Sequence, residues 1–183
     1  MLALLEIRML SSSDVGALVD FRLQHGDDPL LGPIGERSAH SRLEVVRHDL
    51  ESLTSFGAFD EARLTGVVTS KFLPCSFGLD WTIAGLLVDP VHQGRKIAQR
   101  LIRACCDHMS SLTQTCFLVT YHPEGDDSTA ARSLYTKLGF VDYGPGSFSH
   151  SEQGVRYMKQ SMSAESTLIV QRLEAASAET RFT

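Results

Sequence analysis

The chain has 183 residues, of which 43% are hydrophobic and 21% are charged. Domains average roughly 150 residues, so this length predicts about one domain, and the composition excludes a wholly disordered chain. The net charge is -5, from 17 Lys and Arg against 22 Asp and Glu, and a nucleic-acid partner usually requires a basic excess. No apolar run reaches the roughly 18 residues of a membrane span, so the sequence also argues against a membrane protein.

Hydrophobic periodicity and turn residues predict the elements in chain order. The apolar start Met1–Leu10 lacks the basic region and cleavage site of a signal peptide, so we expect a first strand over 4–9. Ser11 and Asp14 have the spacing of a capping box, which predicts that a helix follows. The expected helices are 15–23, 38–53, 97–109 and 128–138, and the expected strands are 4–9, 56–59, 64–73, 81–88, 116–121, 140–143 and 155–161.

This order of strands and helices predicts a mixed α/β sheet. The nearly continuous apolar stretch 81–88 is typical of a central strand that is covered on both faces. Gly139 is placed to end the helix before it, and Gly144-Pro145-Gly146 is expected to be a turn. We expect one domain over 1–162, and a tail over 163–183 that either frays or forms a helix around Leu168–Leu173.

The segment from Leu86 to Ala98 combines the end of a strand, a turn and the start of a helix. Amides at a helix N-terminus have no partner within the helix, and the helix dipole adds positive charge there, so such a turn binds anions. Gly94 permits close approach of the backbone, and Arg95 and Lys96 add mobile positive charge. A pyrophosphate suits this turn, although an ordinary solvated loop before a core helix has the same composition. Neither the dinucleotide fingerprint nor the P-loop pattern is present.

Two segments resemble motifs of the GNAT N-acetyltransferase superfamily. Val88–Ala98 is similar to motif A, which reads Gln/Arg-x-x-Gly-x-Gly/Ala, with Gln93 and Ala98 as the matching ends. Lys96 stands where the motif has glycine, and its amide is expected to keep a phosphate contact if its φ is negative. Ala131–Phe140 resembles motif B, Ala-x-x-Leu-Tyr-x-x-x-Gly-Phe. The resemblance covers about residues 4–161.

The resemblance implies a central, mostly antiparallel mixed sheet flanked by about four helices. It also implies that acetyl-CoA lies as co-substrate in a splay between two parallel strands, 81–88 and 116–121. The strand backbone would pair with pantetheine and polarise the thioester, and the turn amides would hold the pyrophosphate. The cofactor-binding residues implied are Leu86, Leu87, Val88, Gln93, Gly94, Arg95, Lys96, Ile97, Ala98, Gln99 and Ser128.

The same resemblance implies that Tyr135 is the general acid that protonates the departing thiolate. The alternative is that Tyr135 only packs within the apolar stripe of its helix. A base must deprotonate the substrate amine, and the placement of Asp80, His122 and Glu124 near strand ends makes them candidates. His92 and His40 have no particular support as bases.

The acceptor is expected to bind between Phe21 and Leu53, where acidic residues either hold an ammonium group or only solvate the surface: Asp27, Asp28, Glu36 and Glu44. The histidines show no metal-ligand spacing, so no metal is expected. The cysteines, Cys75, Cys105, Cys106 and Cys116, are expected to be free thiols in a reducing cytoplasm.

The leading interpretation is an acetyl-CoA-dependent N-acetyltransferase that acts on a primary amine in a ternary complex. The alternatives are a non-catalytic sensor that binds CoA, or an interaction module. A homodimer stays open, and neither nucleic acid nor membrane is expected as a partner.

Overall fold

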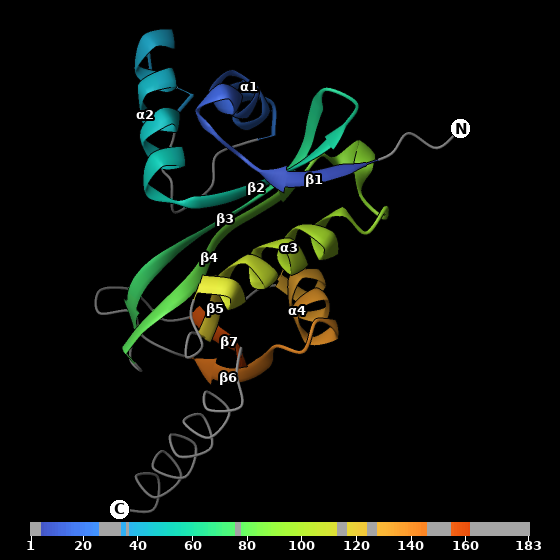
Figure 1. The fold of residues 1–183 in the computed structure, drawn as a ribbon. Coiled ribbons are helices and arrows are strands. Elements are labelled where there is room, and N and C mark those ends of the chain that lie inside the picture. Colours follow the sequence, from blue (N-terminus) through green and yellow to red (C-terminus); the bar gives the residue numbers. More distant parts are fainter. Residues whose placement is uncertain are drawn as a thin grey trace, which may run out of the picture. The chain divides into compact units, whose positions relative to one another are not determined.

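The computed structural model describes residues 5–25, 34–35, 37–75, 78–112, 117–123, 128–145 and 155–161. Its strands and helices follow the predicted order, with two short 3-10 turns at Ser12–Asp14 and Pro90–His92. The helices are α1 (Val15–His25), α2 (Ala39–Ser52), α3 (Ile97–Leu112) and α4 (Ser128–Lys137) (Figure 1). The strands are β1 (Glu6–Met9), β2 (Thr54–Asp60), β3 (Arg63–Cys75), β4 (Gly78–Val88), β5 (Phe117–Pro123), β6 (Val141–Pro145) and β7 (Val155–Ser161).

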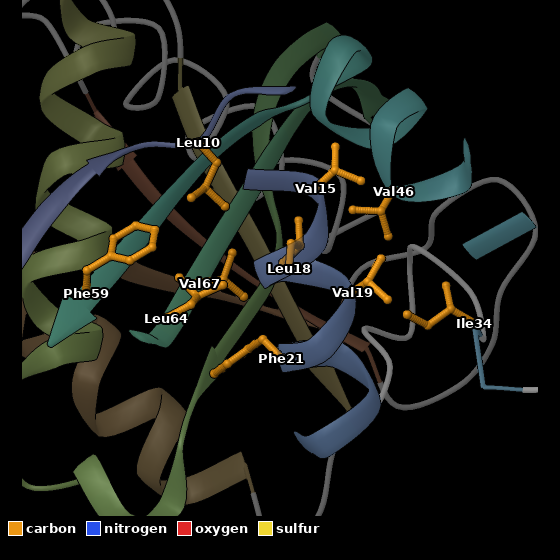
Figure 2. Close-up of a cluster of buried hydrophobic side chains, with 10 residues drawn as sticks. All are labelled: Leu10, Val15, Leu18, Val19, Phe21, Ile34, Val46, Phe59, Leu64 and Val67. Atoms are coloured by element: carbon orange, nitrogen blue, oxygen red, sulfur yellow. The ribbon is translucent and has the colours of Figure 1, made fainter. Parts of the chain in front are cut away.

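The chain divides into two compact units, Met1–Lys71 with Ile83–Cys105, and Phe72–Thr82 with Cys106–Thr183. In the first unit the strand order is β1-β2-β3-β4, and β2 pairs antiparallel with both β1 and β3. Helices α1 and α2 pack against each other, and their apolar faces contribute to one buried cluster with residues of the sheet (Figure 2). Its members are Leu10, Val15, Leu18, Val19, Phe21, Ile34, Val46, Phe59, Leu64 and Val67.

Local signals in the sequence explain where these helices begin. The carboxylate of Asp14 accepts a hydrogen bond from the Ser11 amide at 2.9 Å, which confirms the reciprocal half of the expected capping box. Ser38 accepts from the Ser41 amide at 3.2 Å and caps α2. Ser38 thus satisfies an amide that α2 leaves unpaired, and Asp14 holds the start of the 3-10 turn that leads into α1.

A β-bulge in β3 shapes the first unit next to the end of β4. Ala58 pairs with Gly66 and Phe59 pairs with Leu64, so Thr65 is the extra residue on β3. This shift places both Leu64 and Val67 in the buried cluster, although they are three residues apart. It also leaves the Thr65 carbonyl to accept the Asp89 amide at 2.9 Å, just after β4 ends.

The second unit has the strand order β5-β7-β6, and both pairs are antiparallel. Helix α4 packs against β5 and β6, and Gly139 ends it with φ +88°, as the sequence predicted. Gly144 and Pro145 lie in β6 and not in the expected turn, since Pro145 pairs with Arg156, and Gly146 lies outside the described residues. Proline is tolerated there because β6 is an edge strand.

These elements confirm the predicted mixed α/β class with mostly antiparallel pairing. Strands β4 and β5 are longer than expected, so Asp80 lies within β4 and His122 within β5 rather than beside them. None of the described helices combines the length and apolarity needed to cross a bilayer. The predicted tail over 163–183 lies outside the described residues, and the single domain over 1–162 stays a prediction.

Candidate functional site

The β4–α3 loop, residues 89–96, has the backbone that the anion-binding interpretation requires at Gly94. Gly94 has φ +80° and Lys96 has φ +61°, both in the left-handed region that glycine favours. The φ of Lys96 is therefore not negative, so the condition under which its amide would keep a phosphate contact is not met. Lys96 thus adopts a backbone conformation that glycine favours, at the position where the motif has glycine.

The amides at the end of this loop are unused by the rest of the described chain. The Gln93 amide donates to the Pro90 carbonyl at 3.3 Å, and the first helical bond runs from the Arg100 amide to the Lys96 carbonyl at 3.1 Å. Between them, the six amides of Gly94–Gln99 have no hydrogen bond to the residues that the structure describes. The neighbouring donors on either side of Lys96, at a helix N-terminus, form a site for an anion with several oxygens.

Close packing holds the start of α3 against β3. A Cβ on Gly66 would lie 3.1 Å from Ile97 Cγ2 and 3.2 Å from Leu101 Cδ1, tighter than ordinary contact. The same Cβ would lie 3.3 Å from the Leu87 carbonyl oxygen, so glycine lets strand and helix approach closely. Ile97 and Leu101 are almost fully buried, and they anchor the helix whose first turn carries the free amides.

The side chains of the loop do not all behave as the sequence suggested. Arg95 donates to Asp60 at 2.8 Å, so its charge is tied to the turn between β2 and β3 and is not mobile. This hydrogen bond is the main reason that the pKa of Asp60 lies below its ordinary value. Lys96 is exposed and supplies positive charge at the mouth of the turn.

Asp89 fixes the point where the loop leaves β4. Its carboxylate accepts from the Val91 amide at 3.0 Å and from the Arg63 guanidinium at 3.0 Å. The residue is 1% exposed. Burial acts to raise the pKa of Asp89, but the Val91 amide and nearby histidines outweigh it, so the pKa is lowered and the carboxylate stays ionised.

Two histidines, which the sequence analysis did not connect with this site, lie beside Asp89. His92 Nδ1 is 3.2 Å from Asp89 Oδ2, and His25 Nε2 is 3.8 Å from the same oxygen. His92 Nε2 is 3.5 Å from Asp60 Oδ2. The only sequence signal for this cluster was an Asp-Pro pair after an apolar strand, which indicates a turn but does not identify the partners.

The predicted pantetheine-binding residues form the end of β4. Leu86, Leu87 and Val88 are half-buried and lead directly into the β4–α3 loop. Ala98 and Gln99 are half-buried in the first turn of α3. All the residues assigned to the cofactor before and within this turn are therefore consecutive in one strand–loop–helix unit.

Tyr135 lies on α4, and Ser128 is the first residue of that helix. Tyr135 is 5% exposed, and its ring packs on Phe140 with centroids 5.3 Å apart. The Tyr135 carbonyl accepts the amides of Leu138 and Phe140, each at 3.0 Å. The ring of Tyr135 therefore packs as the alternative interpretation expected. The role of its hydroxyl as general acid stays a prediction.

The remaining candidates are less completely placed. For Asp80 and His122 the structure describes only the backbone, and Glu124, Asp27, Asp28 and Glu36 lie outside the described residues. Glu44 is exposed on α2 and pairs with Arg47 one turn away, which fits a solvated surface. Cys105 is a buried free thiol, and burial raises its pKa to about 11.

The sequence profile that matches this chain and the solved structures with a similar fold point to the same family. Residues 24–140 match the sequence profile described as the acetyltransferase (GNAT) family. A comparison of the sequence with curated proteins found none that matches. Three solved structures illustrate the fold similarity.

The ribosomal-protein-S5-alanine acetyltransferase of Vibrio fischeri aligns with TM-score 0.65 and 18% identity, over 87% of this chain and 94% of that one. The ribosomal-protein-S18-alanine N-acetyltransferase of Escherichia coli aligns with TM-score 0.61 and 16% identity, over 87% and 95%. The PaiA N-acetyltransferase of Thermoplasma acidophilum, solved in complex with coenzyme A, aligns with TM-score 0.61 and 17% identity, over 86% and 99%.

Proposed function

The chain belongs to the GNAT family of acetyltransferases, and we propose that it transfers the acetyl group of acetyl-CoA to a primary amine. The enzyme class, an acyltransferase, follows from the family. The proposal adds the amine acceptor, the direct attack in a ternary complex and the roles of individual residues.

One observation carries the proposal for the cofactor. The amides of Gly94–Gln99 are unpaired within the described chain and lie at the N-terminus of a 16-residue helix. A pyrophosphate brings several anionic oxygens that such a row of donors can bind. The exposed Lys96 adds positive charge beside it, and one of the fold neighbours was solved with coenzyme A bound.

The chemistry begins with loss of a proton from the substrate ammonium, because only the neutral amine has a lone pair. Asp80 and His122 are the proposed bases, with Glu124 as a further candidate. The amine nitrogen then attacks the thioester carbonyl carbon, and backbone donors at the end of β4 stabilise the developing oxyanion. As the carbon–sulfur bond breaks, the thiolate takes a proton from the Tyr135 hydroxyl. The attacking nitrogen gives up its second proton to form the neutral amide, and that proton restores the tyrosine.

Calorimetric titration with acetyl-CoA tests the cofactor assignment. We expect saturable binding with a Kd below about 1 mM, since weaker binding would correspond to less than roughly 4 kcal/mol of binding free energy. Absence of saturable binding below that concentration would exclude the transferase proposal.

Tyr135→Phe tests the acid assignment. The ring can keep its contact with Phe140, so we expect folding and acetyl-CoA affinity to change little. Turnover should fall by about 100-fold or more, which is typical when a general acid is removed. Steady-state kinetics with an accepted amine measure this, and unchanged turnover would leave Tyr135 with a packing role only.

A non-catalytic CoA-binding sensor is the second candidate. It is favoured by Lys96 at the glycine position, where the side chain adds bulk close to the phosphate turn. Release of free thiol from acetyl-CoA in the presence of a library of amines separates the two functions once binding is established. Continuous thiol release that depends on the amine supports the enzyme, and binding without release supports the sensor.

We also propose that the protein works in the cytoplasm. The free, buried thiol of Cys105 fits a reducing cytoplasm. The acceptor is proposed as a small or protein-borne primary amine, and a homodimer is compatible with this chemistry. Mass measurement in solution tests the oligomeric state.

A further inference from the structure

His92 occupies an unusual position between two carboxylates that come from different elements. Its Nδ1 is 3.2 Å from Asp89 Oδ2, in the β4–α3 loop, and its Nε2 is 3.5 Å from Asp60 Oδ2, at the end of β2. The side chain is 13% exposed, so water has little access to it. A neutral imidazole carries one N–H, and the other nitrogen would then direct its lone pair at an anion. Nδ1 has no partner in hydrogen-bond geometry among the described residues, so its contact with Asp89 is one of charge, and only the imidazolium is attracted to both carboxylates.

The charges around His92 keep both carboxylates ionised. Arg63, at the start of β3, donates to Asp89 at 3.0 Å, and Arg95 donates to Asp60 at 2.8 Å. The pKa values of Asp60 and Asp89 both lie below the ordinary value for an aspartate. His25, at the end of α1, also faces Asp89 at 3.8 Å. The cluster therefore contains two carboxylates, two guanidinium groups and two histidines.

This cluster joins the root of the β4–α3 loop to the turn between β2 and β3. Asp89 directs the chain out of β4, and the unpaired amides begin five residues later at Gly94. A bridge from Asp89 through His92 to Asp60 restrains the first half of the loop from two sides. Arg95 restrains the second half through the same Asp60 carboxylate.

We propose that His92 is a positioning residue for acetyl-CoA: its protonated ring links Asp89 to Asp60 and holds the loop amides in the arrangement that binds pyrophosphate. This inference rests on the proposed function. A neutral ring in this place would not attract both carboxylates, so the link between Asp89 and Asp60 would be lost. The loop then has more freedom, and binding must restrict it again, which lowers affinity.

The test measures affinity as a function of pH with dephospho-CoA, which keeps the pyrophosphate but lacks the 3′-phosphate that itself titrates near neutral pH. Calorimetric Kd values are collected from about pH 5.5 to pH 8, the range in which histidines change charge. For the wild type we expect affinity to be about three- to tenfold higher at the acid end. His92→Gln should bind about as weakly as the wild type at pH 8 and should show little dependence on pH.

Three further variants separate this bridge from other histidine effects. His40→Gln, at an exposed position on α2, is the matched control and should keep the wild-type profile. His25→Gln should keep most of it, because His25 faces one carboxylate only. Asp60→Asn removes the second carboxylate, so it should flatten the profile and provides an independent test if His92→Gln does not fold.

The outcomes distinguish this inference from the function on which it rests. If the wild type binds neither acetyl-CoA nor dephospho-CoA, both the proposed function and the role of His92 fall. If it binds acetyl-CoA but not dephospho-CoA, the loop amides do not hold the pyrophosphate and the role of His92 falls alone. If the affinity of His92→Gln or Asp60→Asn for dephospho-CoA still depends on pH as in the wild type, the role of His92 is also overturned. The same holds if the pH dependence is lost in His25→Gln alone.

Discussion

Lys96 shows how a turn can impose its backbone on a residue poorly suited to it. A non-glycine residue in the left-handed region carries a steric penalty of about 1 kcal/mol or more. Lys96 accepts φ +61° because Gly94 before it and the buried Ile97 after it determine the path of the chain. The position therefore combines a backbone conformation that glycine favours with a charged side chain.

Comparison of Lys96→Gly with Lys96→Ala separates the backbone from the charge. Both variants remove the ammonium group, but only glycine relieves the steric conflict of a Cβ at positive φ. We expect Lys96→Gly to be more stable than Lys96→Ala by about 1 kcal/mol, measured by urea unfolding. Equal stability of the two variants would contradict the strain at this position. Any loss of acetyl-CoA affinity common to both reports the contribution of the charge.

The part of the candidate site made of backbone amides could be predicted from the sequence. The strand end, Gly94 and the helix start follow one another in a single segment of the chain, so the row of free amides could be anticipated. The pairing of Arg95 with Asp60 could not, because 35 positions separate them in the chain. The environment of His92 depends on the same contact between distant segments.

The connection between β1 and α1 is stabilised by an ion pair that responds to acid. Arg8 Nη2 lies 2.6 Å from Asp14 Oδ1, and the Arg8 guanidinium carbon is 4.1 Å from the centre of the Phe59 ring. The hydrogen bond from Arg8 is the main cause that lowers the pKa of Asp14 from 3.8 to about 2. The stability from this lowered pKa is fully present above about pH 4 and is lost as the pH falls towards 2.

Asp14→Asn tests this dependence. We expect the variant to be less stable than the wild type by about 1 kcal/mol near pH 6, because Arg8 is partly exposed and solvent screens the pair. The difference should shrink as the pH falls below about 4, which chemical unfolding at several pH values measures. Asp20→Asn, at an exposed position of α1, is the control and should not show this trend. A difference that stays constant with pH would assign the loss to capping rather than to charge.

Helices α1 and α2 are joined by a second ion pair in a more buried place. Arg22 Nη1 lies 3.0 Å from Asp49 Oδ2, and the two side chains are 1% and 17% exposed. Asp49→Asn removes the charge opposite a buried guanidinium, and we expect a loss of about 3 kcal/mol in the free energy of unfolding. Glu44→Gln breaks an exposed pair with Arg47 on the same helix and should cost less than about 0.5 kcal/mol. Similar losses for both variants would show that burial does not strengthen the Arg22–Asp49 pair.

The ends of strands β5 and β6 differ from the predicted ones because they are set by pairing with β7, a strand distant in the sequence. Strand β6 continues through Gly144 and Pro145 because β7 provides partners for them. Strand β5 includes His122, which pairs with Arg156 on β7. Local composition favours a turn at Gly-Pro-Gly, but it carries no information on a neighbouring strand. Helix boundaries were closer to prediction, since caps such as Ser38 and Gly139 act locally.

Binding of acetyl-CoA should stabilise the whole chain if the proposed function is correct. A ligand that binds only the folded state adds about 2.7 kcal/mol at a concentration of 100 times its Kd. For a chain of 183 residues this corresponds to a rise in Tm of several degrees. Thermal unfolding with increasing acetyl-CoA measures the shift, and AMP, which lacks the pyrophosphate, serves as the control. No rise at saturating acetyl-CoA would contradict binding to the folded protein.

The amino-acid sequence alone determined the fold class, the family and the loop that presents backbone donors. Those properties depend on periodicity, glycine placement and helix termini, and each is set by residues near one another in the chain. Only the tertiary structure decided the β-bulge at Thr65 and the cluster of Asp60, Asp89 and His92 around the root of that loop. Such contacts arise when the sheet brings remote segments together, and the charge and distance that define them do not exist until the chain has folded.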